Sequence, residues 1–239
     1  MRRALVTGAT SGIGKAIVER LRAEDYHVTA VGRRADKLAA LAEQTGCQAA
    51  PGDVTDLATM RDILAGAQPD ILINNAGIGL GITGLETLTE NDLAHAIATN
   101  VTAPLQLTQL ALPQMKAAGS GHIVNMGSIA GLHTLVSALY GAGKAAVHQF
   151  SQNLRYELVG TGIRVTEICP GRVASEFYDQ STGNIEANSI GAAAFRALDP
   201  GDVADAVAYA LSVPAHVNIS TMELLPTAQA VGGVKTGQA

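Results

Sequence analysis

The stretch SALYGAGKAAV, residues 137–147, places a tyrosine and a lysine four residues apart among small apolar residues. That spacing puts Tyr140 and Lys144 on one face of a helix. A free tyrosine has a pKa of about 10, and lowering it to about 7 requires roughly 4 kcal/mol of preferential stabilisation of the phenolate. One ammonium about 4 Å away supplies that amount at an effective dielectric of about 20. The pair is therefore predicted to exchange protons near neutrality.

Two further polar residues could complete this chemistry. Ser128 follows a β-branched run, and its hydroxyl could orient a carbonyl group and stabilise negative charge that develops on it. Asn100 lies inside a long helical pattern, where asparagine is a poor residue. Asn100 therefore marks either a functional position or only a break before Pro104.

The run TGATSGIG, residues 7–14, joins a short apolar strand to an amphipathic helix. Glycine lets the backbone approach a phosphate closely, and the N–H groups and dipole of a helix N-terminus attract anions. The spacing is Gly-x-x-x-Gly-x-Gly rather than Gly-x-Gly-x-x-Gly. We predict a nucleotide site, with a merely tight turn as the alternative. The residues expected to bind the cofactor here are Gly8, Thr10, Ser11, Gly12, Ile13 and Gly14.

The end of the second strand, VGRRADK, bears on the choice of cofactor. A ribose 2′-hydroxyl requires an acidic acceptor at this place, whereas a 2′-phosphate requires cations. Arg33 and Arg34 stand there without a carboxylate at the strand tip, and an arginine fork suits a phosphate. The sequence favours NADPH over NADH, with Arg33 as the better candidate because it lies nearer the strand end. The alternative is two solvated arginines at the start of a helix.

Short motifs after the third and fourth strands are expected at the same site. Asp53 could accept a hydrogen bond from the adenine amino group while Val54 packs on the ring, although Asp53 could instead cap a helix. In the run NNAG, residues 74–77, the Asn75 amide could brace neighbouring loops. Ala76 and Gly77 leave room for a ribose.

Strands and helices alternate along the whole chain, which predicts right-handed strand–helix–strand units in one parallel sheet and a single α/β domain over 1–239. The strands are expected at 4–7, 27–32, 47–51, 70–74, 121–127, 163–169 and 219–225. The helices are expected near 12–24, 36–45, 57–65, 90–117, 138–159 and 201–212. The polar segment 172–199 breaks this alternation and is interpreted as a substrate lid.

Composition excludes several classes of protein. The 239 residues carry a net charge of −5, which argues against a nucleic-acid partner. No stretch approaches the roughly 18 apolar residues of a membrane span, and the N-terminus lacks the pattern of a signal peptide. Two cysteines, Cys47 and Cys169, provide neither a disulfide framework nor metal-type spacing. We expect a soluble cytoplasmic protein without a metal.

Taken together, these motifs resemble the short-chain dehydrogenase/reductase family over about residues 1–228. The resemblance rests on TGATSGIG (7–14), Asp53, NNAG (74–77), Asn100, Ser128, Tyr140-x-x-x-Lys144 and Pro170-Gly171, in that order. It implies a Rossmann-like doubly wound sheet of seven strands in the order 3-2-1-4-5-6-7. It also implies a homotetramer or homodimer that uses the helices near 101–117 and 138–159, and hydride transfer between NAD(P) and an alcohol–carbonyl pair.

The resemblance also assigns roles to residues. It implies that Lys144 holds the nicotinamide ribose and that Asn100 holds a water in a proton relay. The cofactor is expected to contact Tyr140, Lys144, Pro170, Gly171 and Val173. The chain departs from the family at Gly143, where serine or threonine is common. Tyr140 follows Ser128 by 12 positions, where 13 is common in the family, so the loop between them is one residue shorter. Ser175 stands where the family commonly has a threonine.

The predicted function is an NADPH-preferring carbonyl reductase or alcohol dehydrogenase. The tail 214–229 resembles NADP-dependent 3-hydroxy acid and serine dehydrogenases, which favours a small 3-hydroxy acid or its aldehyde. Arg172 could bind the carboxylate of the substrate or form a structural salt bridge. Tyr178 and Phe177 could line the substrate pocket. Apolar secondary ketones or alcohols are the alternative substrates. One rival function is a non-catalytic NADP(H)-binding regulator, against which Tyr140 and Lys144 argue. Another is a dehalogenating lyase, against which Lys144 and the intact glycines of the turn argue.

Overall fold

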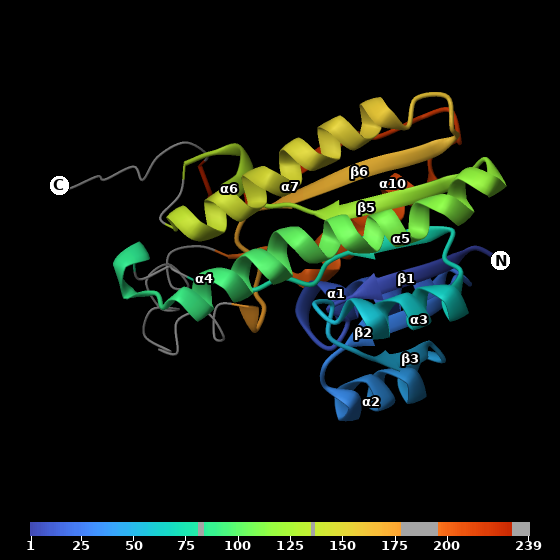
Figure 1. Cartoon of the computed structure of the whole chain (residues 1–239), viewed down its shortest axis with the longest axis horizontal. Helices are drawn as coiled ribbons and strands as arrows, with labels where there is room; N and C mark the ends of the chain where they lie inside the picture. Colours follow the sequence, from blue (N-terminus) through green and yellow to red (C-terminus); the bar gives the residue numbers. More distant parts are fainter. Residues whose placement is uncertain (81–83, 135–136, 178–195, 231–239) are drawn as a thin grey trace.

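A seven-stranded parallel sheet forms the centre of the molecule (Figure 1). The computed structural model describes residues 1–80, 84–134, 137–177 and 196–230. The strand order is β3-β2-β1-β4-β5-β6-β7, as the resemblance implied. The strands are β1 (Arg3–Thr7), β2 (His27–Gly32), β3 (Gln48–Pro51), β4 (Ile71–Asn74), β5 (Gly121–Met126), β6 (Ile163–Pro170) and β7 (Thr221–Leu224).

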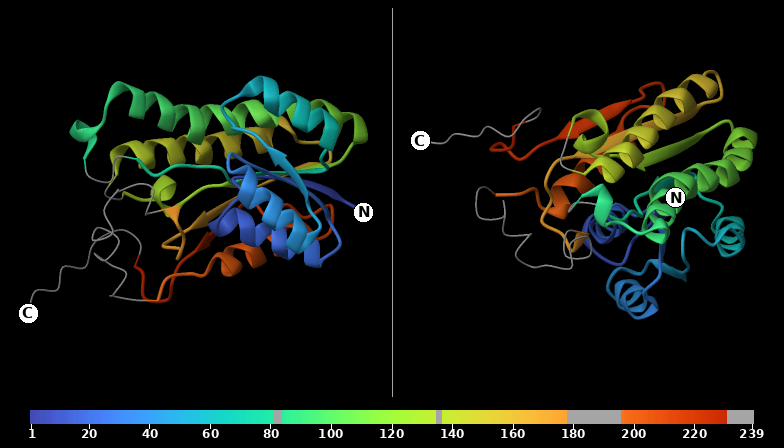
Figure 2. Two further views of the ribbon diagram at one scale, coloured as in Figure 1. Left: turned by 90° about the horizontal axis from the view of Figure 1, so that it is seen from below. Right: turned by 60° about the vertical axis from the view of Figure 1, so that its left-hand side comes forward.

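Helices cover both faces of this sheet, which Figure 2 (left) shows nearly edge-on. Helices α1, α2 and α10 pack on one face, and α3, α5 and α7 pack on the other. The helices are α1 (Gly12–Ala23), α2 (Ala35–Thr45), α3 (Leu57–Ala67), η1 (Leu85–Thr87), α4 (Glu90–Ile97), η2 (Ala98–Thr102), α5 (Ala103–Ala118), α6 (Ile129–Leu132), α7 (Ala138–Glu157) and α10 (Pro200–Ser212).

Burial on both faces explains the apolar runs of the central strands. In β1, Val6 packs toward α1 and α10, while its neighbour Leu5 packs toward α3 and α5. In β4, Ile73 and Leu72 divide between the two faces in the same way. All four side chains are fully buried. Such strands read as continuous hydrophobic segments rather than alternating ones, because neither face meets water.

Strands β1 and β4 are neighbours in the sheet, and the direction in which the chain adds strands changes between them. After β1 the chain builds outward through β2 and β3, and after β4 it builds in the other direction through β5, β6 and β7. Helix α1, which follows β1, and helix α5, which comes after β4, therefore pack on opposite faces, and ligands usually bind at the carboxyl ends of the strands at such a point. The predicted glycine turn follows β1, and the NNAG motif spans the end of β4.

The structure corrects one predicted helix. A single helix near 90–117 is instead α4, the π-helical η2 and α5, with Asn100 in the π-helical segment. The short helices η1 and α6 were not predicted. Tyr178 and most of the predicted lid, 172–199, lie outside the described residues. Within the described part of the chain, no helix is long and apolar enough to cross a membrane.

Candidate active site

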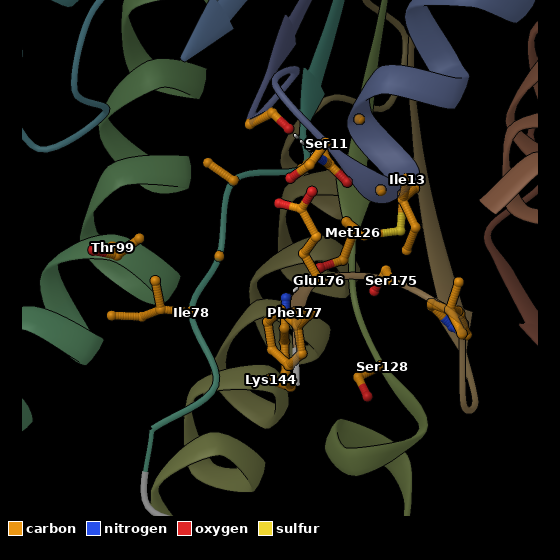
Figure 3. Close-up of a pocket in the computed structure, with 18 of the residues that line it drawn as sticks. Ser11, Ile13, Ile78, Thr99, Met126, Ser128, Lys144, Ser175, Glu176 and Phe177 are labelled. Carbon is orange, nitrogen blue, oxygen red and sulfur yellow. Dashed lines mark hydrogen bonds between the residues drawn. The ribbon is translucent and has the colours of Figure 1, made fainter. Parts of the chain in front are cut away.

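A cavity of about 840 Å³ opens at the carboxyl ends of the strands. Ser11 and Ile13 lie at one end of it, and Ser128 and Lys144 lie at the other (Figure 3). The lining includes every described residue that the sequence assigned to cofactor binding: Gly8, Thr10, Ser11, Gly12, Ile13, Gly14, Arg33, Arg34, Asp53, Val54, Asn75, Ala76, Gly77, Tyr140, Lys144, Pro170, Gly171 and Val173. The fold thus brings together residues that are far apart in the chain.

The glycine turn between β1 and α1 requires glycine for two different reasons. Gly8 and Gly12 have positive φ values of +67° and +51°, which side-chain-bearing residues rarely adopt. At Gly14 a side chain would overlap the carbonyl of Gly8. The Ser11 side chain, at the N-cap of α1, does not cap the helix. The turn therefore offers close backbone approach and helical N–H groups, which fits a diphosphate.

The loop after β4 holds the glycine turn in place. The Asn75 amide donates to the carbonyl of Thr7 over 2.9 Å. The Thr7 hydroxyl accepts from the backbone N–H groups of Asn75 and Ala76, each over 3.0 Å. Asn74 instead points into the core and donates to Asn125 over 2.9 Å. The amides of the NNAG motif therefore brace the two neighbouring strand ends, as the sequence suggested.

The two arginines after β2 differ in position. The Arg34 guanidinium lies against the glycine turn, where its Nη2 donates to Thr10 Oγ1 over 2.8 Å and to Ser11 Oγ over 2.7 Å. Arg33 has a side chain that is 59% exposed, and its Nη1 lies 3.9 Å from the carboxylate of Asp53. Both line the cavity. The predicted preference for Arg33 over Arg34 stays a prediction.

Asp53 is not the cap of a helix. Its Oδ1 accepts from the backbone N–H of Thr55 over 2.9 Å and from the Thr55 hydroxyl over 2.8 Å. Partial burial acts to raise the pKa of Asp53, but the hydrogen bonds from Thr55 and the charge of Arg33 outweigh it and lower that pKa. The cap of α3 is Asp56, which accepts from Ala58 and Thr59. The helix-cap alternative for Asp53 is therefore wrong.

Lys144 is a buried ammonium at the inner end of the cavity. It is 5% exposed, and its Nζ donates to the carbonyl of Met126 over 2.7 Å. Nζ also lies 5.7 Å from the centre of the Tyr140 ring. Burial lowers the pKa of Lys144 to about 8, although the nearby Cys169 and Glu167 act to raise it. Tyr140 and Lys144 thus share one helix face and one cavity.

Asn100 stands directly behind this pair. Its Oδ1 accepts from the backbone N–H of Ile78 over 2.8 Å, and its Nδ2 donates to the carbonyl of Ile78 over 2.8 Å. A side chain on Gly77 would lie 3.3 Å from Asn100 Oδ1 and 3.7 Å from Lys144 Nζ, so both polar groups converge there. π-Helical turns such as η2 are frequent at functional sites. Asn100 anchors the loop after β4 beside Lys144.

Ser128 lies across the cavity from the loop that Asn100 anchors. It is the N-cap of α6, and its Oγ accepts from the backbone N–H of Ala130 over 3.1 Å. It is 8% exposed and lines the cavity together with Tyr140 and Lys144. The hydroxyl hydrogen remains able to donate to a carbonyl oxygen, because the bond to Ala130 uses only a lone pair.

Arg172 follows β6 and also lines the cavity. Its backbone N–H donates to the side chain of Gln229 over 2.8 Å, and its carbonyl accepts from Leu198 over 3.0 Å. Sequence reasoning missed Gln229, which crosses from the chain's tail to the cavity, and Glu176, which reaches into it. Both residues lie in irregular segments, where no periodic pattern distinguishes inward-facing side chains.

A buried carboxylate on β6 lies close to Lys144. Glu167 is fully buried, and its Oε2 accepts from His148 Nδ1 over 2.6 Å. Cys169 stands two residues further on the same strand, and burial raises the pKa of its thiol. Both cysteines are buried and unpaired. His148 is thus held by its hydrogen bond to the buried Glu167, and Cys169 is packed in the core of the sheet.

Comparison with known proteins settles the family. The family described as short chain dehydrogenase matches residues 2–185. The chain belongs to the short chain dehydrogenase family. It is 38% identical to the NADP-dependent 3-hydroxy acid dehydrogenase YdfG of Escherichia coli K12, over 96% of this chain and 97% of that protein.

Solved structures agree with this membership. The chain is similar to the closed form of serine dehydrogenase complexed with NADP+, with a TM-score of 0.92, 37% identity and coverage of 99% of both chains. It is also similar to a short-chain dehydrogenase from Sphingobium yanoikuyae in complex with NADPH, with a TM-score of 0.80 and 28% identity over 96% of this chain and 89% of that one. The predicted family and the predicted strand order are confirmed.

Proposed function

We propose that this dehydrogenase is an NADPH-preferring oxidoreductase that reversibly reduces an aldehyde or ketone to an alcohol. The observation that carries the proposal is the position of Tyr140 and Lys144 at the inner end of the cavity that begins at the glycine turn. The glycine turn fits the diphosphate of the cofactor, and Arg34 with Arg33 supplies cations for a 2′-phosphate. The relatives named above use or bind NADP, which supports the same cofactor here.

Ser128, Tyr140, Lys144 and Asn100 have different tasks in the proposed reaction. NADPH, when bound, supplies the hydride. Ser128 donates a hydrogen bond to the carbonyl oxygen and stabilises the negative charge that develops there. Tyr140 gives its phenolic proton to that oxygen. Lys144 stabilises the resulting phenolate and binds ribose hydroxyls, and Asn100 fixes the loop beside Lys144 and takes part in returning the proton from solvent.

Lys144 Nζ lies 5.7 Å from the centre of the Tyr140 ring, so its charge would stabilise a phenolate there. The positive charge of the oxidised nicotinamide would add to this stabilisation. We therefore expect the apparent pKa of turnover to depend on which form of the cofactor is bound.

The proposed substrate is a small 3-hydroxy acid or the corresponding aldehyde. The names of the YdfG and serine dehydrogenase relatives support this class. Arg172 lines the cavity at the carboxyl end of β6, where it could contact a substrate carboxylate. Apolar secondary ketones and alcohols are the second candidate, because Ile129, Ala130 and Phe177 give the same end of the cavity apolar walls.

The proposed assembly is a cytoplasmic homodimer or homotetramer that uses α5 and α7. Two observations support it. Both cysteines are free, which suits a reducing compartment. Leu105 on α5 and Tyr156 on α7 are large apolar side chains exposed in the single chain.

The test compares wild-type protein with Tyr140→Phe. Nicotinamide absorbance is followed with NADP+ and a panel of 3-hydroxy acids that includes serine, and with NADPH and apolar ketones. We expect turnover by the wild type and its loss in Tyr140→Phe, with NADPH affinity retained because the ring is kept. Near-normal turnover in Tyr140→Phe would refute the role of the tyrosine. NADPH binding by the wild type without turnover of any substrate would support the regulator instead.

A further inference from the structure

Glu176 forms ion pairs with two cations beside the glycine turn. Its Oε2 lies 3.1 Å from Arg34 Nη1, and its Oε1 lies 3.4 Å from Lys37 Nζ. Glu176 belongs to the segment after β6, and Figure 3 shows it lying between Phe177 and Ser11 in the cavity. The hydrogen bond from Arg34 lowers the pKa of Glu176, so the carboxylate is ionised at neutral pH. Each oxygen of the carboxylate thus faces one cation, Arg34 or Lys37.

The guanidinium that Glu176 contacts is held in place by the glycine turn. Arg34 donates from Nε and Nη2 to Thr10 and from Nη2 to Ser11, which leaves Nη1 for an anion. Lys37 lies one helical turn further along, on α2. An arginine with a fixed plane and a nearby lysine form a suitable site for a phosphate.

The residues on either side of Glu176 follow the same cleft. Ser175 lies against the turn, because a side chain on Gly12 would come within 3.1 Å of its Cβ. Phe177 packs against Tyr140, with the ring centres 5.5 Å apart and the ring planes tilted by 56°. The segment 175–177 therefore extends from the glycine turn to the catalytic tyrosine, and the Glu176 carboxylate is one of several contacts that place it there.

We propose that Glu176 is a specificity-determining residue that competes with the 2′-phosphate of NADP(H) for Arg34 and Lys37. This inference rests on the proposed function, in which these cations receive that phosphate. A 2′-phosphate must displace the carboxylate before it can bind Arg34, whereas NADH has no such group and leaves both ion pairs intact. Glu176 therefore weakens NADPH binding selectively and narrows the preference for NADPH over NADH.

The size of the effect follows from the exposure of the pair. The Glu176 side chain is 46% exposed and that of Arg34 is 34% exposed, so each ion pair is weak. Loss of both pairs is expected to raise the affinity for NADPH by roughly three- to tenfold. Glu176→Gln keeps the size of the side chain and removes the charge. Glu24→Gln is the matched control, because Glu24 pairs with Arg20 at the far end of α1 and is similarly exposed.

The experiment measures dissociation constants by calorimetry, since the chain has no tryptophan for fluorescence. Wild type, Glu176→Gln and Glu24→Gln are titrated with NADPH, with NADH and with adenosine 2′,5′-bisphosphate. We expect Glu176→Gln to bind NADPH and the bisphosphate roughly three- to tenfold more tightly, with NADH changed by less than about twofold. In an Arg34→Ala background the same substitution should have a smaller effect, because the shared cation is gone.

Two results would overturn the inference. Unchanged or weaker NADPH binding by Glu176→Gln would mean that the carboxylate does not compete with the phosphate, or that it orders Arg34 for binding. An equal gain for NADH would mean that Glu176 obstructs the cleft without regard to the phosphate. Circular dichroism and a second variant, Glu176→Ala, separate these results from misfolding. If the wild type neither binds nor turns over NADPH, the proposed function itself fails.

Discussion

Replacement of Lys144 by methionine is expected to abolish turnover and yet stabilise the fold at neutral pH. Lys144 is 5% exposed, and burial lowers its pKa from 10.5 to about 8. A charged group with such a pKa costs the folded protein about 3 kcal/mol below pH 8. Methionine has a similar length and no charge. It cannot donate to the Met126 carbonyl, and that lost hydrogen bond costs about 1 kcal/mol. Lys144→Met should therefore be more stable by about 2 kcal/mol near pH 7.

The advantage of the variant should disappear as the pH rises. Between about pH 8 and pH 10.5 the unfolded wild-type chain binds more protons than the folded one, because the pKa of Lys144 is lower in the fold. Wild-type stability therefore increases with pH across this window, while the variant lacks the group. The difference in free energy of unfolding should approach zero near pH 10. The charged or titratable groups around Lys144 are Tyr140, Glu167 and Cys169, and all three are retained in the variant.

Urea denaturation followed by circular dichroism at a series of pH values measures this difference. Lys116→Met is the control, since Lys116 is exposed near the end of α5 and its replacement should give no such pH dependence. A difference between Lys144→Met and wild type that stays constant from about pH 7 to about pH 10 would refute the reasoning. It would show that the ammonium carries no large burial cost.

Two glycines are predicted to respond in opposite ways to alanine. At Gly143 a new Cβ would lie 3.7 Å from Asn100 Cβ and 3.8 Å from Val101 Cγ2, both ordinary contacts. Gly143→Ala should therefore raise stability by up to about 1 kcal/mol and keep turnover, and a lower melting temperature would contradict this. At Gly14 the same change would overlap the Gly8 carbonyl and the Asn75 amide. Gly14→Ala should lose NADPH affinity and melt at a lower temperature, and wild-type binding by calorimetry would contradict the assignment of the turn.

The strands could be predicted from sequence because each central strand is buried on both faces. The range predicted for β2, 27–32, matches His27–Gly32, since Gly32 and the polar residues after it end the apolar run. The break in the helix near 90–117 was only an alternative interpretation of Asn100, and a single helix was predicted. A π-helical turn adds one residue within a continuous helical path, and the apolar pattern around it changes little. The low helix propensity of Asn100 was the one feature of the sequence that indicated an irregularity at that position.

The different contacts of the neighbouring arginines could not be predicted from sequence. Arg33 and Arg34 have the same chemistry, and only the structure places Arg34, at the N-cap of α2, against Thr10 and Ser11. Glu176 was missed for another reason. Its partner Arg34 lies 142 residues away in the chain, and the segment around Glu176 has no periodic pattern. Contacts between residues so far apart in the chain form only when the sheet is assembled.

The brace between Thr7 and Asn75 has a consequence for folding. These residues are 68 positions apart, and the chain between them forms β2 and β3 on the far side of β1. Closing so long a loop carries a large entropic cost before any contact at the carboxyl ends of β1 and β4 compensates for it, which makes parallel sheets of this kind slow to fold. A nascent chain that ends before β4 has the whole glycine turn but lacks Asn75 and Ala76, which hold that turn in place. Nucleotide affinity should therefore arise late, as a property of the completed sheet.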